Sequence, residues 1–324
     1  MGTRVAAIDF YLENGDLMRR MFAQAGIDVV EADSRKGQEA TTVLRGVQGI
    51  ITSYGDFSAS VIDALDPTVK VISRTGVGVD NIDVEAATRR GIAVCYVPGY
   101  ATEVVSTHAI ALALAVLRRI TEADRNVRAG KWDLAHLPAL GQVAGRTFGI
   151  VGYGAIGRET ARKAAGLGFD VVVWSRSLER EGAAATPEGY PCLPLDTLVS
   201  TADVVSLHTA LVPATRNLID RRRIARMKPG AVLVNTARGG LVDAAALACA
   251  LEEGRLFGAG LDVFPEEPLD SGSPLVRAPR TVLTPHAAYQ SEEAVRELCE
   301  RSVQAVIDVV QGRAPADCIN PSVL

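Results

Sequence analysis

The glycine-rich segment at residues 152–157, GYGAIG, constrains the fold of this chain more than any other stretch. It directly follows an apolar run at residues 148–151 and precedes a helical pattern at residues 158–165. In such a strand–turn–helix unit the glycines permit a tight turn, close approach of the backbone to a pyrophosphate, and packing of the helix on the strand. Free N–H groups at the helix N-terminus then face the anion. The segment predicts a dinucleotide site containing Gly152, Gly154, Ala155, Ile156 and Gly157; a purely structural glycine turn is the alternative.

Two series of short apolar runs alternate with helical patterns along the chain, which is typical of α/β folds with parallel sheets. A long helix, apolar in its second half, is predicted at residues 102–119 and another at residues 291–311. We therefore expect one α/β domain, residues 1–100 and 287–324, split by insertion of a dinucleotide-binding domain, residues 101–286. The predicted strands lie at residues 5–9, 27–31, 49–53, 69–73 and 93–97, then at 147–151, 171–174, 204–207, 231–235, 258–262 and 282–284.

Composition excludes several classes of function. The 324 residues include 34 basic and 38 acidic side chains, so no broad positive surface is expected to bind nucleic acid. The five cysteines lack the paired spacing of a structural zinc site, and we expect no metal and reduced thiols. No secretory signal is evident, and the longest apolar stretch is far shorter than a membrane span. We expect a cytoplasmic protein that does not enter a membrane.

The residues after the second strand of the inserted domain bear on cofactor choice. An acidic residue at that position would bind the ribose 2′-hydroxyl of NAD, but the sequence there is Ser175, Arg176 and Ser177. Hydroxyl groups and a guanidinium suit a 2′-phosphate, which favours NADP over NAD. Alternatively, Arg176 stacks on adenine or faces solvent.

Only four histidines are available for acid–base chemistry. His108 lies within the apolar helix and is interpreted as packed, His136 has no evident partner, and His208 follows a strand on the cofactor side. His286 ends the last predicted strand, at the sheet edge where open α/β folds bind ligands. It is the strongest candidate.

Two other strand ends are expected at the same edge as His286. Arg238 follows one strand, and the acidic pair Glu266 and Glu267 follows another. An arginine can bind a keto-acid carboxylate bidentately, a histidinium can donate a proton, and a carboxylate can keep the imidazole protonated. Taken singly, Arg238 or Glu267 is as readily explained by a surface ion pair.

The chain resembles the D-isomer-specific 2-hydroxyacid dehydrogenases over nearly its whole length. Four motifs carry this resemblance: residues 75–83, TGVGVDNID; residues 152–157; residues 235–240, NTARGG; and residues 284–288, TPHAA. It implies a flavodoxin-like substrate domain interrupted by a Rossmann domain, a homodimer, and the catalytic set Arg238, Glu267 and His286. It also implies that N–H groups of Val77 and Gly78 bind the substrate carboxylate and that Asp262 lies near the nicotinamide. On the cofactor side we add Thr209, Thr215, Thr236 and Ala237.

Within this family, residues 239–243 and 286–291 are most similar to the C-terminal-binding transcriptional co-repressors. That branch has tryptophan at the position of Tyr289, a candidate substrate-pocket residue, and an arginine facing the ligand at the position of Arg74. The cofactor segment instead resembles the NADPH-using glyoxylate and hydroxypyruvate reductases.

We therefore expect an oxidoreductase for a small 2-keto or 2-hydroxy acid, with a dinucleotide-sensing protein of the co-repressor type as the alternative. A phosphoglycerate dehydrogenase is less favoured, because residues 52–57 offer no cation for a substrate phosphate and we expect no regulatory domain. The dimer interface is expected at residues 130–143, which include Trp132, Leu134, Leu137 and Leu140.

Overall fold

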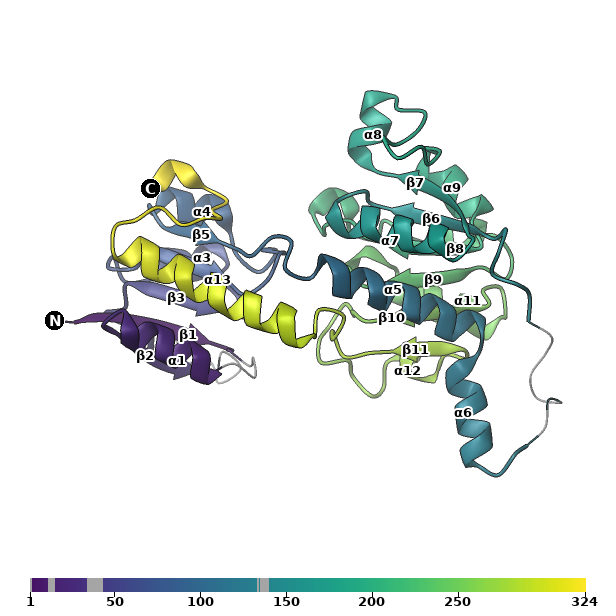
Figure 1. Cartoon of the computed structure of the whole chain (residues 1–324), viewed down its shortest axis with the longest axis horizontal. Helices are drawn as coiled ribbons and strands as arrows, with labels where there is room; N and C mark the ends of the chain where they lie inside the picture. Colours follow the sequence, from purple (N-terminus) through teal and green to yellow (C-terminus); the bar gives the residue numbers. More distant parts are fainter. Residues whose placement is uncertain (1, 11–14, 34–42, 133, 135–139) are drawn as a thin grey trace. The chain divides into compact units, whose positions relative to one another are not determined.

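The computed structural model describes residues 2–10, 15–33, 43–132, 134 and 140–324. The chain divides into two compact units (Figure 1). Unit 1 consists of Met1–Tyr100 and Gln290–Leu324, and unit 2 of Ala101–Tyr289.

Unit 1 is built on a five-stranded parallel sheet in the order β2-β1-β3-β4-β5. This order is that of flavodoxin-like folds. The inner strands and β5 are almost wholly buried, whereas the edge strand β2 is largely exposed or half-buried, which fits a parallel sheet covered on both faces. They are β1 (Thr3–Ile8), β2 (Ile27–Ala32), β3 (Gly49–Thr52), β4 (Val71–Arg74) and β5 (Ala93–Cys95).

Helices cover both faces of this sheet and define two apolar cores. α1 (Gly15–Gln24) and the long α13 (Glu292–Val310) pack on one face, where Phe22 and Val303 are fully buried. α3 (Ala59–Asp63) and α4 (Val84–Arg89) pack on the other, over Ile50 and Ile72. Ser291 caps α13, because its side chain accepts a hydrogen bond from the N–H of Ala294. The chain ends in the short 3₁₀ helix η4 (Pro321–Val323).

Unit 2 contains a six-stranded parallel sheet in the order β11-β10-β9-β8-β6-β7. The strand order reverses between β6 and β8, and at such a switch point open α/β sheets bind their ligands. The predicted fold class, a Rossmann domain inserted into a flavodoxin-like domain, is thereby confirmed. The strands are β6 (Thr147–Val151), β7 (Asp170–Trp174), β8 (Val204–Leu207), β9 (Val232–Asn235), β10 (Gly258–Leu261) and β11 (Thr281–Leu283).

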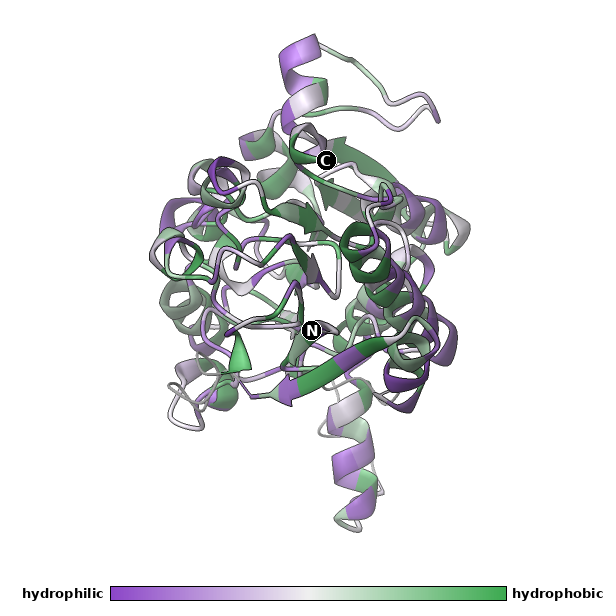
Figure 2. Ribbon diagram, turned by 90° about the vertical axis from the view of Figure 1, so that its left-hand side faces the viewer, coloured by the Kyte–Doolittle hydropathy of each residue, from purple (hydrophilic) through white to green (hydrophobic). Residues whose placement is uncertain are grey.

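The second sheet is also covered on both faces. Figure 2, coloured by hydropathy, shows purple, hydrophilic stretches along the outer sides of the helices. α5 (Thr102–Leu117) and α7 (Ala155–Gly166) pack on one face, around Phe148 and Ile150. The opposite core includes Leu198, Leu233 and Leu251. Its helices are α9 (Leu195–Thr201), α10 (Arg221–Arg226), α11 (Ala244–Glu252) and α12 (Pro274–Arg277). The remaining short helices are α8 (Arg176–Glu181), η2 (Pro213–Thr215) and η3 (Gly239–Leu241).

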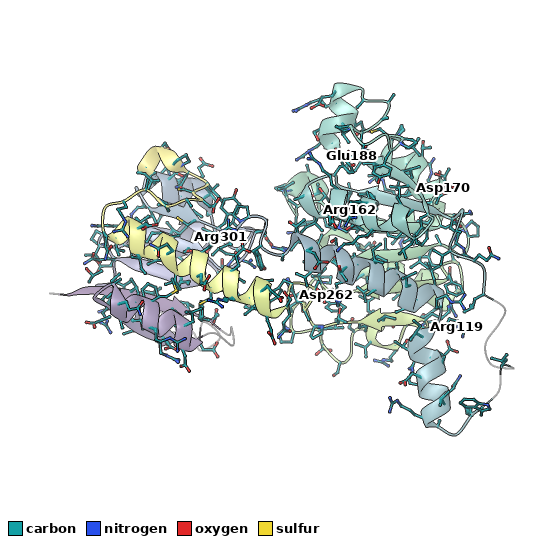
Figure 3. The ribbon with its side chains drawn as sticks, in the orientation of Figure 1. Arg119, Arg162, Asp170, Glu188, Asp262 and Arg301 are labelled. Atoms are coloured by element: carbon teal, nitrogen blue, oxygen red, sulfur yellow. The ribbon has the colours of Figure 1, made fainter. Side chains whose placement is uncertain are left out.

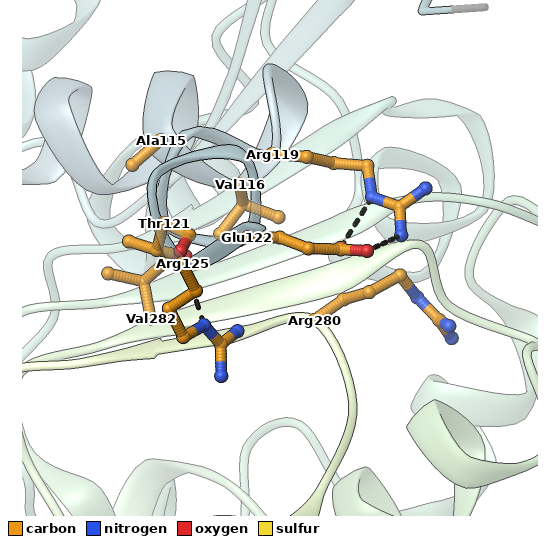
Figure 4. Close-up of a pocket in the computed structure, with 8 residues that line it drawn as sticks. All are labelled: Ala115, Val116, Arg119, Thr121, Glu122, Arg125, Arg280 and Val282. Atoms are coloured by element: carbon orange, nitrogen blue, oxygen red, sulfur yellow. Dashed lines mark hydrogen bonds and ion pairs between the residues drawn. The ribbon is translucent and has the colours of Figure 1, made fainter. Parts of the chain in front are cut away.

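The apolar helix expected at residues 102–119 ends earlier, at Leu117. Arg119 adopts a left-handed conformation, with φ of 51°, and a separate helix α6 (Ile120–Arg128) follows. None of its side chains is buried, and the sequence analysis did not predict this helix. Among the described residues no single helix is long and apolar enough to cross a membrane, although α5 and α6, bent by 60°, reach that length as a pair. A small pocket lined by arginines lies at this bend (Figure 4), away from the strand ends discussed below.

Candidate active site

The glycine-rich turn joins β6 to α7 as the sequence predicts. Gly152 has a φ of 102°, and a Cβ there would collide with the backbone of His208 and Thr209. A Cβ at Gly157 would overlap the carbonyl of Gly152, so helix and strand are in direct contact. Beside Gly154, by contrast, there is open space, and no side chain caps the start of α7. The N–H groups at Ala155 and Ile156 are thus left for an anionic ligand, which fits a dinucleotide pyrophosphate.

The ends of β8 and β9 adjoin this turn. The backbone of Thr209 lies against Gly152. The hydroxyl of Thr215 is engaged within its own loop, where it donates to the carbonyl of Ala210 at 2.7 Å. Thr236 Oγ1, in contrast, is buried and has no hydrogen-bond partner among the described residues. An orphaned buried hydroxyl is unfavourable, so its position suits a ligand that offers a polar group.

Arg238 is held at the end of β9 by a residue that sequence reasoning overlooked. Asn235 is buried; its Oδ1 accepts from the N–H of Ala237 at 3.0 Å, and its Nδ2 donates to the carbonyl of Arg238 at 2.9 Å. Gly239 then approaches the Phe264 backbone so closely that a Cβ would overlap it. The loop carrying Arg238 therefore packs directly on the loop carrying Glu267.

His286 and Glu267 form the central pair of this edge. His286 Nδ1 lies 2.7 Å from Glu267 Oε2, and the other carboxylate oxygen accepts from the N–H of Phe264 at 2.9 Å. Partial burial tends to raise the pKa of Glu267, but the hydrogen bond and charge of His286, the Phe264 N–H and the charge of Arg238 together bring it below its ordinary value. Because an ionised carboxylate only accepts, Nδ1 of His286 carries the proton in this bond. Arg238, Glu267 and His286 thus interact within one unit.

A second buried carboxylate holds the loop on which His286 stands. His286 itself has a left-handed φ of 54°, and its N–H donates to the carbonyl of Asp262 at 2.7 Å. The fully buried Asp262 carboxylate (Figure 3) accepts from the N–H groups of Ala287 and Ala288, both at 2.9 Å. These three contacts fix the backbone on both sides of the imidazole.

Thr284 links Asp262 to His108. Thr284 Oγ1 lies 2.5 Å from Asp262 Oδ1 and 3.0 Å from His108 Nε2. The carboxylate can only accept, so the threonine hydroxyl donates to Asp262 and accepts from the Nε2–H of His108. His108 is therefore more than a packed residue, since Thr284 joins it to the Asp262 carboxylate. The sequence analysis missed Thr284 because its two partners are far from it along the chain.

Among the described residues, His208 does not compete with His286 as the proton donor. Burial lowers the pKa of His208 to about 3, so this imidazole is neutral throughout the neutral pH range, and its Nε2 bonds to Ser206 at 2.9 Å. His136 lies outside the described residues.

The predicted substrate residues fall in both units. In unit 2 the ring of Tyr289 packs edge-on against His286, with centroids 6.3 Å apart. In unit 1 Arg74 ends β4 and folds over Gly76, donating to the carbonyl of Thr75 at 2.9 Å. Val77 follows with 42% of its surface exposed, and Gly78 lies beside it in the same loop.

The segment predicted to select the cofactor begins α8. Ser175 is the N-cap residue of this helix, and its Oγ accepts from the N–H of Leu178 at 3.3 Å. It also lies 3.1 Å from Ser177 Oγ. Arg176 is exposed at the first position of α8. The serine hydroxyl is therefore partly committed to capping, whereas the guanidinium is accessible to a ligand.

Comparison with known proteins adds an independent line of support. The family model described as D-isomer specific 2-hydroxyacid dehydrogenase, NAD binding domain, matches residues 110–288. A glyoxylate reductase of Korarchaeum cryptofilum (strain OPF8) is 42% identical over 269 residues, which cover 82% of this chain and 80% of that protein. The crystal structure of the TT0316 protein from Thermus thermophilus is 38% identical, with a TM-score of 0.88 over 98% of this chain and 100% of that one. That of a glyoxylate reductase from Paecilomyes thermophila is 30% identical, with a TM-score of 0.87 over 99% and 100%.

Proposed function

The chain belongs to the D-isomer specific 2-hydroxyacid dehydrogenases, and on this premise we propose that it reduces small 2-keto acids, with glyoxylate as the first candidate. It is an oxidoreductase that uses a pyridine nucleotide. The observation that carries the proposal is the His286–Glu267 bond of 2.7 Å beside Arg238. Because these relatives are named as enzymes, the dinucleotide-sensing alternative is not favoured, and the likeness to the co-repressor branch is not confirmed.

The three side chains have complementary tasks in the proposed reaction. The planar guanidinium of Arg238 binds the substrate carboxylate and polarises the carbonyl. Since Nδ1 of His286 is engaged by Glu267, the proton for the carbonyl oxygen comes from Nε2. Glu267 remains ionised and stabilises the imidazolium. The turn at Gly152, Gly154 and Gly157 would hold the pyrophosphate of a reduced nicotinamide dinucleotide, which would supply the hydride.

We further propose that NADPH is preferred over NADH. No carboxylate stands at the end of β7, and the exposed Arg176 begins the helix that follows this strand. In dinucleotide-binding folds the adenine ribose lies at the end of this strand. A guanidinium favours a phosphate dianion over a hydroxyl.

The homodimer and the cytoplasmic location belong to the same proposal. Large apolar side chains on and after α6 are strongly exposed: Trp132 by 88%, Leu134 by 81%, Ile120 by 54% and Val127 by 52%. Such a group of side chains is typical of a protein interface. Leu140 is half-buried, and Leu137 lies outside the described residues. The cysteines are thiols, which is typical of a reducing compartment.

A substrate panel tests the function. Glyoxylate, hydroxypyruvate, pyruvate and 2-ketobutyrate would each be assayed with NADPH and with NADH. We expect kcat/KM to be highest for a small keto acid with NADPH. Absence of turnover with every acid and both cofactors would contradict the proposed function, whereas a higher kcat/KM with NADH would contradict only the cofactor preference.

A further inference from the structure

The chain's last residues extend the sheet of unit 1 by a short antiparallel contact. Cys318 pairs with Cys95, the last residue of the edge strand β5, and the N–H of Ile319 donates to the carbonyl of Val94 at 2.9 Å. Because this bond joins the residues flanking the two cysteines, Cys95 and Cys318 form a non-hydrogen-bonded pair. In such pairs the Cα atoms are about 4.5 Å apart, which lies within the range of about 4.4–6.8 Å found for disulfides.

The two thiols also contact each other, and they differ in exposure. Cys95 is fully buried, whereas Cys318 is partly exposed. The thiol of Cys318 donates to Asn320 Oδ1 at 3.5 Å, and it lies close enough to Cys95 to influence the pKa of that thiol. Burial above all, with smaller effects of Cys318, Asp317 and Asp308, raises the pKa of Cys95. Cys318 is therefore the thiol that an oxidant reaches first.

We propose that Cys95 and Cys318 are an oxidation site at which hydrogen peroxide or another hydroperoxide forms an intrachain disulfide. The Cys318 thiolate attacks one peroxide oxygen, the O–O bond breaks, and a sulfenic acid and water (or an alcohol) result. The sulfur of Cys95 then attacks the sulfenic sulfur, its proton leaves with the hydroxyl group as a second water, and the S–S bond forms. Two thiols lose two electrons and two protons, and the peroxide accepts them.

The disulfide would join the segment around Cys318 covalently to the edge strand β5, which this segment already covers. Asn320 is buried and binds the N–H of Val94 at 2.7 Å and the carbonyl of Ile92 at 2.9 Å. Arg301, labelled in Figure 3, joins Asp317 at 2.8 Å to the carbonyl of Pro98 at 2.9 Å. These contacts hold the two cysteines in register before oxidation. A covalent link at this point restricts the unfolded chain and protects the edge strand from opening.

The test uses the full chain, first reduced and then treated with hydrogen peroxide. After remaining thiols are blocked, trypsin releases residues 91–118 and 314–324, which contain Cys95 and Cys318. We expect mass spectrometry to find these two peptides joined, lighter by two hydrogens than their sum. The melting temperature should rise by several degrees and return on reduction, and kcat should not change, since Arg238, Glu267 and His286 lie in unit 2.

Three variants keep the result interpretable. Cys318→Ser should abolish both the cross-link and the rise in melting temperature, and it replaces a partly exposed thiol, so folding is retained. Cys95→Ala provides the same test at the buried position, and Cys249→Ser, a partly exposed cysteine on α11, should leave the cross-link intact. A lasting sulfenic or sulfinic acid on Cys318, a disulfide to another cysteine, or a cross-link without any rise in melting temperature would overturn the proposal.

Discussion

At the scale of single residues, the proposed chemistry depends on charge. Glu267 carries a pKa below its ordinary value, since the hydrogen bond and charge of His286, together with Phe264 and Arg238, outweigh the effect of its burial. A carboxylate with a lowered pKa contributes its pairing energy above its unfolded pKa, and that contribution is lost as pH falls through the folded pKa. Glu267 is therefore ionised throughout the neutral pH range and can accept the hydrogen bond from His286 Nδ1.

Removing the charge of Glu267 should change the pH profile of reduction. Glu267→Gln keeps the shape of the side chain but removes the negative charge that favours the imidazolium. We expect the high-pH falling limb of kcat to move to lower pH. Steady-state rates across the pH range check this, and Glu266→Gln at the adjacent exposed position is the control. An unchanged limb would separate Glu267 from the proton donor.

Arg176 should distinguish the two cofactors. A hydrogen bond to a charged group contributes about 1.5–3 kcal/mol. Arg176→Ala should thus raise KM for NADPH about tenfold to a hundredfold and alter KM for NADH little. Arg180→Ala, an exposed arginine in the last turn of α8, serves as the matched control. Equal changes for both cofactors would remove the argument for NADPH.

At the scale of elements, the loops after β9, β10 and β11 are packed on one another through buried polar groups. Asn235 holds the Arg238 loop, and Asp262 holds the His286 loop. The sequence predicted both sheets and the strand ends that carry Arg238, Glu267 and His286, because strand periodicity and turn residues are local signals. It did not predict the roles of Thr284 and His108, whose partners lie on different elements, or that of Asn235, whose amide bonds the backbone of the turn that follows it. It also missed α6, a short exposed helix with only Ile120, Ala123 and Val127 as apolar positions.

The hydroxyl of Thr284 should matter beyond its packing. Thr284→Val removes a hydrogen bond from both Asp262 and His108, and a hydrogen bond to a charged group contributes about 1.5–3 kcal/mol to the free energy of unfolding. We expect a lower kcat as well, because the His286 loop loses part of its support. Chemical denaturation and steady-state kinetics check this, with Thr284→Ser restoring both quantities. Thr281→Val, at the start of β11, should leave kcat unchanged, and a wild-type kcat in Thr284→Val would disprove the link.

At the scale of the whole molecule, the chain interrupts one α/β unit with another, and all three proposed catalytic side chains belong to the inserted unit. The substrate residues proposed in unit 1, Arg74, Val77 and Gly78, stand on the loop after β4. In the proposed reaction we therefore expect proton transfer from unit 2, and we expect unit 1 to contribute to binding of the substrate carboxylate.

The exposed apolar residues of α6 and the following segment predict a dimer. Burying Trp132 and Val127 against a second copy removes apolar area from water. We expect light scattering to give twice the chain mass, and Val127→Glu combined with Trp132→Glu to give a monomer. Leu167→Glu, at an apolar position 44% exposed after α7, is the control and should remain dimeric. A monomeric wild type at micromolar concentration would contradict the dimer.

The most direct measurement is the rate at which His286→Ala oxidises the reduced cofactor in the presence of the best 2-keto acid, compared with the wild type. Loss of a positioned general acid should lower kcat by roughly 10²–10⁴, while cofactor binding, followed by fluorescence, remains near that of the wild type. The same rate in His286→Ala, with a primary isotope effect showing that hydride transfer limits turnover, would contradict the assignment of His286 as the proton donor.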